Sequence, residues 1–313
     1  MKIIEPNVQE VKDFEGVDNF YKAVARAARI CYASDYHEQK QNEYYRNEGT
    51  PQSLIDSTQE KRDRDLVERL IKSGHFSPFE HAIITIPCHI LNNISYRNHC
   101  ILSKLKNKYT ILTEVNDNDR CLASINGRIL IEAIVSSVER KKVLDFIQPM
   151  LILLKENERT NCNLFKSFIV DTSIGCTRQL NTHHDNCYHV EQSTRYCNFS
   201  KDKFGNEVSF NKPYWYDNAN AEKQQRWKED MEQAECNYFK SLKNGDSLDE
   251  ARGRLPLDTH TRAIYTATIE EWQHIIDLRL KGTTGKPHED LQIIAEKIND
   301  LLIAQNTTNG NIQ

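Results

Sequence analysis

The chain has 313 residues, of which 38% are hydrophobic and 27% charged, a composition that predicts a globular protein with a very polar surface. The formal net charge is only −4, so no global field favours nucleic acid or a membrane as a partner. The nine cysteines form no CxxC pair, and the start MKIIEPNVQE lacks the pattern of a secretory signal. We therefore expect a protein of the reducing cytoplasm.

The first half of the chain predicts helices followed by strands. An Ala-rich segment, Phe20–Tyr32, predicts a helix, and Ser57–Ser73 predicts a second one that Gly74 terminates. The apolar, β-branched segments His81–Ile90 and Arg128–Val135 predict two strands. The helices are expected to form the framework on which the strands pack.

The middle of the chain predicts an exposed loop or hairpin and two more helices. Low hydrophobicity and the density of Asn and Asp over Asn107–Arg120 predict an exposed loop or a hairpin. An apolar stripe over Val138–Lys155 predicts a helix with a kink at Pro149. The longest predicted helix is Ala219–Lys243, whose aromatic and Met residues are spaced for one buried face.

Two short helices follow toward the C-terminus, and each carries an arginine. Ser247–Glu250 reads as a capping box that opens the helix bearing Arg252. Thr268 opens another helix, which bears Arg279. The Asn/Thr/Gln-rich end, residues 305–313, predicts a disordered tail.

The most informative motif places a carboxylate, a hydroxyl and a guanidinium at alternate positions, Glu191, Ser193 and Arg195. An arginine grips a phosphate through parallel charge-assisted hydrogen bonds, and a serine adds a short donor. Such a set suits a nucleotide, although the motif alone also fits a solvated polar surface.

The sequence from Glu191 to Glu207, EQSTRYCNFSKDKFGNE, resembles the C-terminal half of the signature RHRxxSxNExSxR of the flavin-dependent thymidylate synthases (ThyX). Further blocks resemble the same family in the same order, namely Ala25–Tyr32, Asp63–Leu70, Gly74–His81, Glu250–Pro256 and Trp272–Arg279. On these blocks the chain is identified as a divergent member of the family with a degenerate RHR motif.

The resemblance implies an α+β, ThyX-like fold in which long helices pack on a mostly antiparallel sheet. We expect a single catalytic domain over residues 1–304, with a family-branch insertion at about 88–165. The family also implies a homotetramer with active sites shared between chains. Arg195 and Arg252 are therefore expected to reach one nucleotide from different subunits.

The same resemblance implies the reaction, methylation of dUMP to dTMP with methylenetetrahydrofolate as carbon donor and NADPH as reductant through FAD. No protein nucleophile bonds to the ring, and Arg279 is the expected catalytic residue because a cation beside the pyrimidine favours its enolate-like form. The expected dUMP-binding residues are Glu191, Ser193, Arg195, Arg252 and Arg279. The expected FAD-binding residues are His81, His183, His184, Glu191 and Lys286.

The chain departs from the family where the flavin should bind, because both arginines of RHR are missing. If Thr182-His183-His184 replaces RHR, the segment up to Glu191 carries one extra residue; the ungapped alternative pairs RHR with His183-His184-Asp185. Two interpretations stay open. The protein is either a ThyX that binds FAD differently, or a homologue that binds a pyrimidine nucleotide and has lost or altered the flavin chemistry, as a sensor or in another nucleotide modification.

Alternative roles exist for several of these side chains. Arg252 and Arg279 would also fit surface salt bridges, and His81 would fit a hydrogen-bonded histidine at a strand end. A dense run of potential ligands allows a zinc-dependent hydrolase or deaminase as a less favoured alternative, which needs three such side chains and an open position. The run consists of His183, His184, Asp185, Cys187 and His189.

Overall fold

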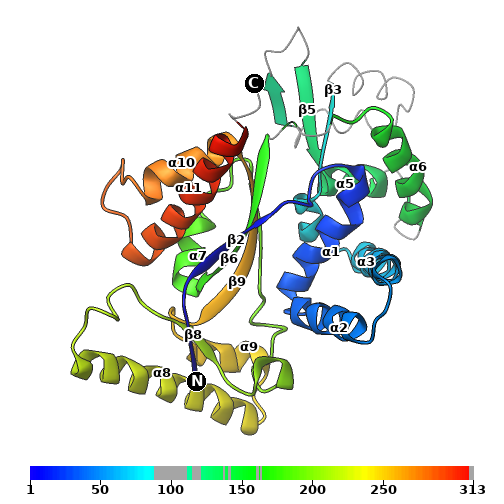
Figure 1. Ribbon diagram of the computed structural model, residues 1–313. Helices are drawn as coiled ribbons and strands as arrows, with labels where there is room; N and C mark the ends of the chain where they lie inside the picture. The colour runs from blue at the N-terminus through cyan, green and yellow to red at the C-terminus, as the bar shows by residue number, and fades with distance from the viewer. Residues whose placement is uncertain are drawn as a thin grey trace.

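A four-stranded antiparallel sheet forms the centre of the protein. The computed structural model describes residues 1–87, 111–114, 121–136, 138–139, 142–159, 162 and 164–309. The sheet has the strand order β2–β6–β9–β7, and each neighbouring pair is antiparallel. Its strands are β2 (Asn7–Val11), β6 (Phe165–Ser173), β9 (His260–Thr268) and β7 (Cys187–Glu191). The predicted α+β class with a mostly antiparallel sheet is confirmed (Figure 1).

Two smaller sheets flank the central one. An antiparallel sheet has the order β3–β5–β4, with β3 (Ile83–Pro87), β5 (Cys121–Asn126) and β4 (Ile111–Glu114). A parallel pair joins β1 (Lys2–Ile4) to β8 (Ser209–Asn211). The strand predicted from His81 is therefore present from Ile83 to Pro87, and its last three residues lie outside the described part of the chain. The described part of the predicted loop or hairpin at 107–120 is strand β4; the rest of it, like nearly half of the predicted insertion, lies outside the described residues.

One face of the central sheet is covered by helices from the first half of the chain (Figure 1). They are α1 (Phe20–Cys31), α3 (Gln52–Ser73), α5 (Gly127–Val135) and α6 (Val143–Lys155), preceded by the 3-10 helix η1 (Val17–Asn19) and joined to β3 through η2 (Ser77–His81). Four alanines of α1 are completely or almost completely buried, so this helix lies close to its neighbours in the largest apolar core. Gly74 ends α3 in the left-handed conformation, as predicted.

The opposite face is covered by α7 (Ile174–Leu180), α10 (Ile269–Arg279) and α11 (Glu289–Asn309). Trp272 of α10 is fully buried in a second apolar core, and its indole donates to the Lys166 carbonyl over 3.0 Å. Thr268 caps α10, as predicted, by accepting from the Glu271 amide. Helix α11 continues through residues 305–309, which were predicted to belong to a disordered tail. The prediction failed there because composition alone does not mark the end of a helix.

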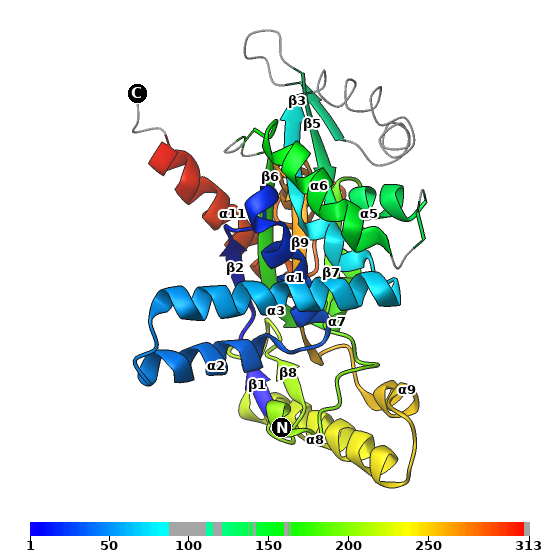
Figure 2. The same ribbon diagram turned by 90° about the vertical axis from the view of Figure 1, so that its right-hand side faces the viewer.

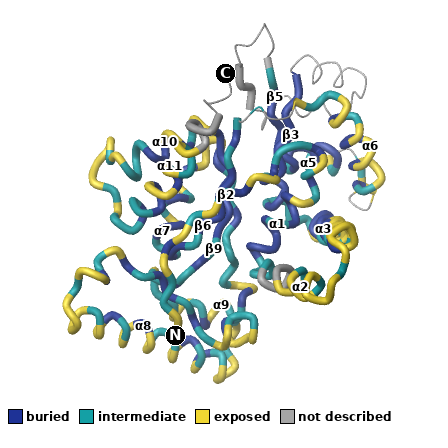
Figure 3. Tube along the Cα trace, in the orientation of Figure 1, coloured by how far each residue is buried: buried dark blue, intermediate teal, exposed yellow. Residues whose placement is uncertain are grey.

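A third apolar core lies between the longest described helix and strand β8. Helix α8 (Ala221–Lys243) buries Trp227, Met231 and Tyr238 against β8, α9 (Leu248–Ala251) and the 3-10 helix η6 (Arg252–Arg254), and η5 (Asp202–Phe204) lies near the same core. The predicted helix and its spacing are confirmed. Both the hydroxyl of Ser247 and the carboxylate of Glu250 make the bonds of the predicted capping box. Figure 3 shows that the central sheet is buried while the outer faces of α8 and α3 are exposed.

One predicted strand is a helix, and several elements were not predicted, among them helices α7 and α11 and the four strands of the central sheet. Residues 128–135, predicted as a strand, belong to helix α5, because Asn126 caps the Ile129 amide over 3.0 Å and starts a helix that is apolar on most sides. Helix α2 (Asp35–Asn47) was not predicted, and it is polar almost all round. The helix predicted from Val138 begins at Val143, and Pro149 lies within it. Within the described residues, no helix has both the length and the apolar character that crossing a membrane requires.

Candidate functional site

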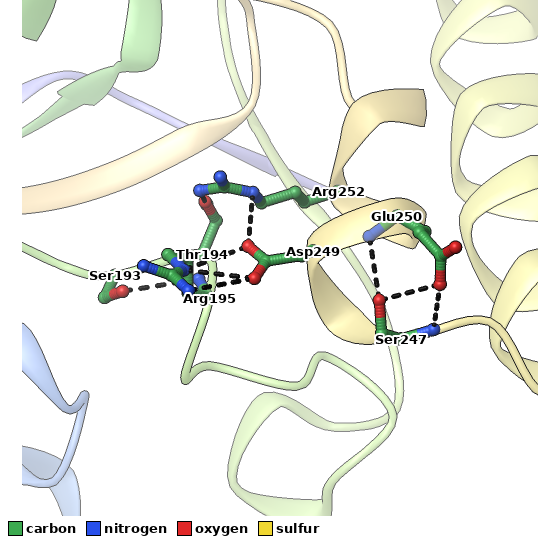
Figure 4. Close-up of polar contacts among 7 residues, drawn as sticks. All are labelled: Ser193, Thr194, Arg195, Ser247, Asp249, Glu250 and Arg252. Carbon is green, nitrogen blue, oxygen red and sulfur yellow. Dashed lines mark hydrogen bonds and ion pairs between the residues drawn. The ribbon is translucent and has the colours of Figure 1, made fainter.

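Two predicted phosphate-binding arginines lie on either side of one carboxylate (Figure 4). Arg195 donates from Nε to Oδ1 of Asp249 over 3.0 Å and from a terminal nitrogen to Oδ2 over 3.0 Å. Arg252 approaches the same Oδ1 through Nε at 3.2 Å, and its guanidinium also donates to the Thr194 hydroxyl over 3.4 Å. The side chains of Arg195, Asp249 and Arg252 are 56%, 47% and 40% exposed. The arginines are thus positioned beside each other and open to a ligand.

Local backbone bonds hold this cluster in place. The Ser193 amide donates to the Cys31 carbonyl at the end of α1, and the Ser193 hydroxyl accepts from the Arg195 amide over 3.3 Å. The Ser193 carbonyl accepts from the Cys197 amide, so the segment forms a turn. On the other side, the capping box at Ser247 orients the short helix α9 that carries Asp249. Segments more than 50 residues apart therefore build one cationic surface.

The arrangement corrects the prediction about subunits. Arg195 and Arg252 lie together in one chain, which contradicts the prediction that they reach one nucleotide from different subunits. The reason is that Asp249, three residues before Arg252, binds both guanidiniums. In chemical terms, a phosphate can take over the donors that Asp249 now engages, because carboxylate and phosphate oxygens match the same guanidinium geometry.

Glu191, at the end of β7, makes its described contacts with α7 rather than with the arginines. Its carboxylate accepts from the Thr177 hydroxyl over 2.9 Å and from the Asn181 amide over 3.5 Å. Asn181 in turn accepts from the Tyr265 hydroxyl over 2.7 Å. Burial raises the pKa of Glu191, although these hydrogen bonds oppose the shift. The network was not predicted, because nothing in the sequence pairs Tyr265 with Asn181.

Arg279 ends α10 and faces the segment that replaces the RHR motif. Its Nε donates to Nε2 of His183 over 3.0 Å, and a terminal nitrogen donates to the Thr182 hydroxyl over 3.1 Å. The predicted pyrimidine-binding arginine and the predicted flavin-binding histidine are therefore neighbours. Arg279 lies with α7 and α10 on one face of the sheet, whereas the Arg195 turn is bonded to α1 on the other face. One chain does not bring all three arginines together.

The residues around His183 alternate in exposure. His183 is buried, and its pKa is lowered to about 4 by burial first and then by the nearby charge of Arg279. Thr182 and His184 are both exposed, and His184 contacts the Thr182 carbonyl over 2.8 Å. Asn186 has a positive φ of 59°, which forms a tight turn before β7. The alignment with an extra residue pairs the two missing arginines with Thr182 and His184, which are both exposed. The ungapped alignment pairs them with His183, which is buried, and Asp185.

Two of the predicted FAD contacts lie elsewhere. His81 is completely buried, with Nδ1 at 2.8 Å from the Thr266 hydroxyl, so the structure gives it the hydrogen-bonded role that the sequence left open. Burial lowers its pKa to about 3. Lys286 is 78% exposed and pairs with Glu289 at the start of α11. Neither side chain contacts His183, Glu191 or Arg279.

The candidate zinc ligands point in different directions. Cys187 is buried, and burial raises its pKa to about 12, which disfavours the thiolate that a metal needs. His189 stacks on the Tyr265 ring, and His183 faces Arg279. Throughout the described part of the chain, no three His, Cys, Asp or Glu side chains are grouped so that they could hold a metal ion.

Two surface grooves lie beside α1 and α3, not at the arginine cluster. One has a volume of about 570 Å³ and lies between α1, α2 and α3, and the other has about 820 Å³ and lies between α1, α3 and α6. The first groove lies near the arginine cluster. Tyr32 lines this groove, and the centre of its ring lies 5.8 Å from the centre of the ring of Tyr196, the residue after Arg195.

Comparison with known proteins decides the family. The family model of the thymidylate synthase complementing protein, Thy1, matches residues 16–147 and 161–305. The chain belongs to the Thy1 family. It is 46% identical over 65 residues to the flavin-dependent thymidylate synthase of Pseudothermotoga lettingae, and 38% identical over 61 residues to the probable flavin-dependent thymidylate synthase of Paramecium bursaria Chlorella virus 1. Each match covers 20% of this chain and spans only 28% of the length of the curated relative.

Solved structures of a UMP/dUMP methylase, PolB of Streptomyces cacaoi, are also similar to this Thy1 protein. The structure with 5-Br dUMP has 16% identity and a TM-score of 0.40, and the one with 5-Br UMP has 14% identity and a TM-score of 0.41. Each similarity covers 96% of this chain and 92% or 91% of the methylase. The ThyX resemblance noted in the sequence is confirmed at the level of the family by the match to the Thy1 family model.

Proposed function

We propose that the protein is a cytoplasmic, flavin-dependent thymidylate synthase that methylates dUMP to dTMP, with methylenetetrahydrofolate as carbon donor and NADPH as reductant. The observation that carries this proposal is the pairing of Arg195 and Arg252 around Asp249 within a chain of the Thy1 family. The nucleotide phosphate would replace Asp249 as the partner of the two guanidiniums, while Ser193 adds a hydroxyl.

The pyrimidine end of the substrate needs a further cation. Arg279 would stabilise the negative charge that develops on the ring oxygen when C5 becomes nucleophilic. Since Arg279 lies across the sheet from the Arg195 turn, a nucleotide that contacts all three arginines needs Arg279 from a second copy of the chain. This separation supports a homotetramer with active sites shared between subunits. Glu191 would orient the nucleotide from the end of β7.

The side chains near Arg279 fit a flavin phosphate in chemical type. Thr182 offers a hydroxyl, His184 an exposed imidazole, and Arg279 a permanent positive charge at 3.1 Å from the Thr182 hydroxyl. FAD bound here would supply the redox chemistry that the methyl transfer requires. His183 would act by orienting Arg279, with which it shares a hydrogen bond, and Glu191 would lie at the boundary between flavin and nucleotide.

A second candidate is a homologue that binds a pyrimidine nucleotide without this redox step. The observation in its favour is that the two arginines of RHR are replaced, by Thr182 and His184 in one alignment or by His183 and Asp185 in the other, whereas Arg195 and Arg252 are retained. Purified protein distinguishes the two. We expect it to be yellow, and to form dTMP from dUMP when FAD, NADPH and methylenetetrahydrofolate are supplied. A folded, colourless protein that binds dUMP but forms no dTMP would favour the second candidate.

A further inference from the structure

The groove between α1, α2 and α3 carries cationic side chains. Figure 2 shows α2 and α3 running side by side across the molecule, and α2 also packs against α1. The described residues that line this groove of about 570 Å³ include three arginines and no carboxylate. Its size is in the range of small-molecule sites. A groove with this lining would attract an anionic ligand.

Two of the arginines are available to such a ligand. Arg62 contacts the face of the Tyr45 ring at 5.8 Å, and Arg69 donates from Nε to the Asp65 carbonyl over 3.3 Å. Among the described residues, neither guanidinium lies within ion-pair distance of a carboxylate. The third arginine, Arg29, is buried and bonded to Asp63 over 2.6 Å, so it contributes less free charge.

The spacing of Arg62 and Arg69 indicates which kind of ligand would fit the groove. Arg62 and Arg69 are seven residues apart on α3, so they lie two turns apart on the same side of the helix, separated by about 10 Å. Within α3, the Gln59 amide donates to the Asp63 carboxylate over 2.8 Å, and the buried Gln59 Oε1 has no described partner. A buried acceptor without a partner favours a ligand that supplies an N–H group. The lining thus suits separate anionic groups joined by amides.

The groove lies near the turn that carries Arg195. Tyr32, at the end of α1, lines the groove, and its ring lies 5.8 Å from that of Tyr196. Tyr196 follows Arg195 directly in the chain. A ligand that reacts at the nucleotide can therefore extend an acidic tail past Tyr32 into the groove.

We propose that this groove binds the amide-linked glutamate tail of the folate co-substrate, with Arg62 and Arg69 each contacting a carboxylate. The proposal rests on the proposed function for the identity of the ligand. A tail of several glutamates matches the lining because it carries a carboxylate on each residue and an amide N–H between residues. Helix α2, which supplies Gln41 and closes one side of the groove, gains a function that its polar sequence does not otherwise explain.

The test is calorimetric titration of the full chain, with and without dUMP, using tetrahydrofolate that carries either one or three glutamates. We expect wild type to bind the triglutamate at least about tenfold more tightly than the monoglutamate. The variant with Arg62→Gln and Arg69→Gln should lose this preference, and the variant with both residues changed to Lys should keep part of it. The matched control, Lys61→Gln with Lys72→Gln, removes two charges from the same helix outside the groove and should keep the full preference.

Several results would overturn the proposal. They are equal binding of the two folates by wild type, a preference that survives in the glutamine variant, and an equal loss in the control. If the glutamine variant lost affinity for NADP⁺ and kept its affinity for the triglutamate, the groove would be assigned to a dinucleotide, and the proposal would also be overturned. Titration with dUMP alone tests the proposed function separately, because Arg62 and Arg69 are not placed at the nucleotide. Thermal unfolding of each variant establishes that it is folded.

Discussion

Arg279 donates a hydrogen bond from Nε to the Nε2 atom of His183 over 3.0 Å. Because Nε2 accepts, the ring proton is assigned to Nδ1, which lies 3.5 Å from the carboxylate of Glu271. His183 is thus held neutral in the folded protein, in agreement with its lowered pKa of about 4. Arg279 keeps its full positive charge, while its orientation is set by a neutral partner.

The first prediction concerns the pH dependence of stability. Since the pKa of His183 is about 4 in the folded protein and about 6.5 when unfolded, only the unfolded chain takes up the proton between these values. The free energy of unfolding should therefore fall as the pH falls from 6.5 to 4. His81 and His260, with pKa values of about 3 and about 4, act in the same direction.

Urea unfolding at pH 7 and pH 5 measures how much His183 contributes to this fall in the free energy of unfolding. His183→Gln should reduce the pH-dependent loss by about 2 kcal/mol, because glutamine accepts from Arg279 without titrating. The control His184→Gln changes an exposed neighbour and should keep most of the loss, because burial, not the nearby His184, is the main cause of the lowered pKa of His183. The same loss in wild type and His183→Gln would contradict a neutral, buried His183.

The second prediction concerns the phosphate. Arg195→Ala removes one guanidinium of the pair around Asp249, and it should weaken dUMP binding by about ten- to a hundredfold. Arg226→Ala is the matched control, because Arg226 is an exposed arginine on α8 whose described ion pair is with Glu222. Titration with dUMP decides between them, and equal affinities in wild type and Arg195→Ala would show that the cluster does not bind the nucleotide.

The third prediction uses the degenerate RHR segment. Thr182→Arg with His184→Arg places two cations at exposed positions on either side of His183, and FAD should bind more tightly as a result. The other alignment predicts rescue by His183→Arg with Asp185→Arg. We expect that pair to lower the melting temperature, because it inserts a charged side chain at a buried position next to Arg279.

Titration with FAD and thermal unfolding test both double variants. Tighter FAD binding by the His183/Asp185 variant would favour the ungapped alignment. Tight binding by wild type without a gain in either variant would mean that the protein holds its flavin through other residues, and that the missing arginines mark no loss.

The fourth prediction concerns the start of α5, the element that the sequence misassigned. Gly127 lies so close to its neighbours that an added Cβ would be 2.8 Å from both the Phe20 ring and the Phe79 carbonyl oxygen. Gly127→Ala should lower the free energy of unfolding by about 1 to 3 kcal/mol. Gly253→Ala is the control, since nothing lies within 4 Å of its added Cβ. Urea unfolding of both variants gives the comparison, and equal stability would contradict the close packing of α5.

Local signals in the sequence predicted most of the helices. Ala-rich composition was sufficient for α1, helical spacing for α8 and a capping residue for α10, because those signals lie within or next to each element. They failed for α5, where an apolar, β-branched run fits a buried helix as well as a strand. They also missed α2, whose few apolar residues give no amphipathic pattern.

The site was predictable in its arginines but not in their arrangement. Arg195, Arg252 and Arg279 came from the family motif, whereas Asp249 became important only because the fold brings it to Arg195 across 54 residues of sequence. His81 is a different case. The sequence left both a cofactor contact and a hydrogen-bonded structural role open, and packing between η2 and β9 buries the ring completely, beside the Thr266 hydroxyl.

The central claim is that this chain makes thymidylate, and growth of a thymidine-requiring host that expresses it tests the claim most directly. We predict that the wild-type chain and the Arg226→Ala control support growth without thymidine, and that Arg195→Ala supports it poorly or not at all. Failure of the wild-type chain, when it is well expressed and folded, would contradict the claim.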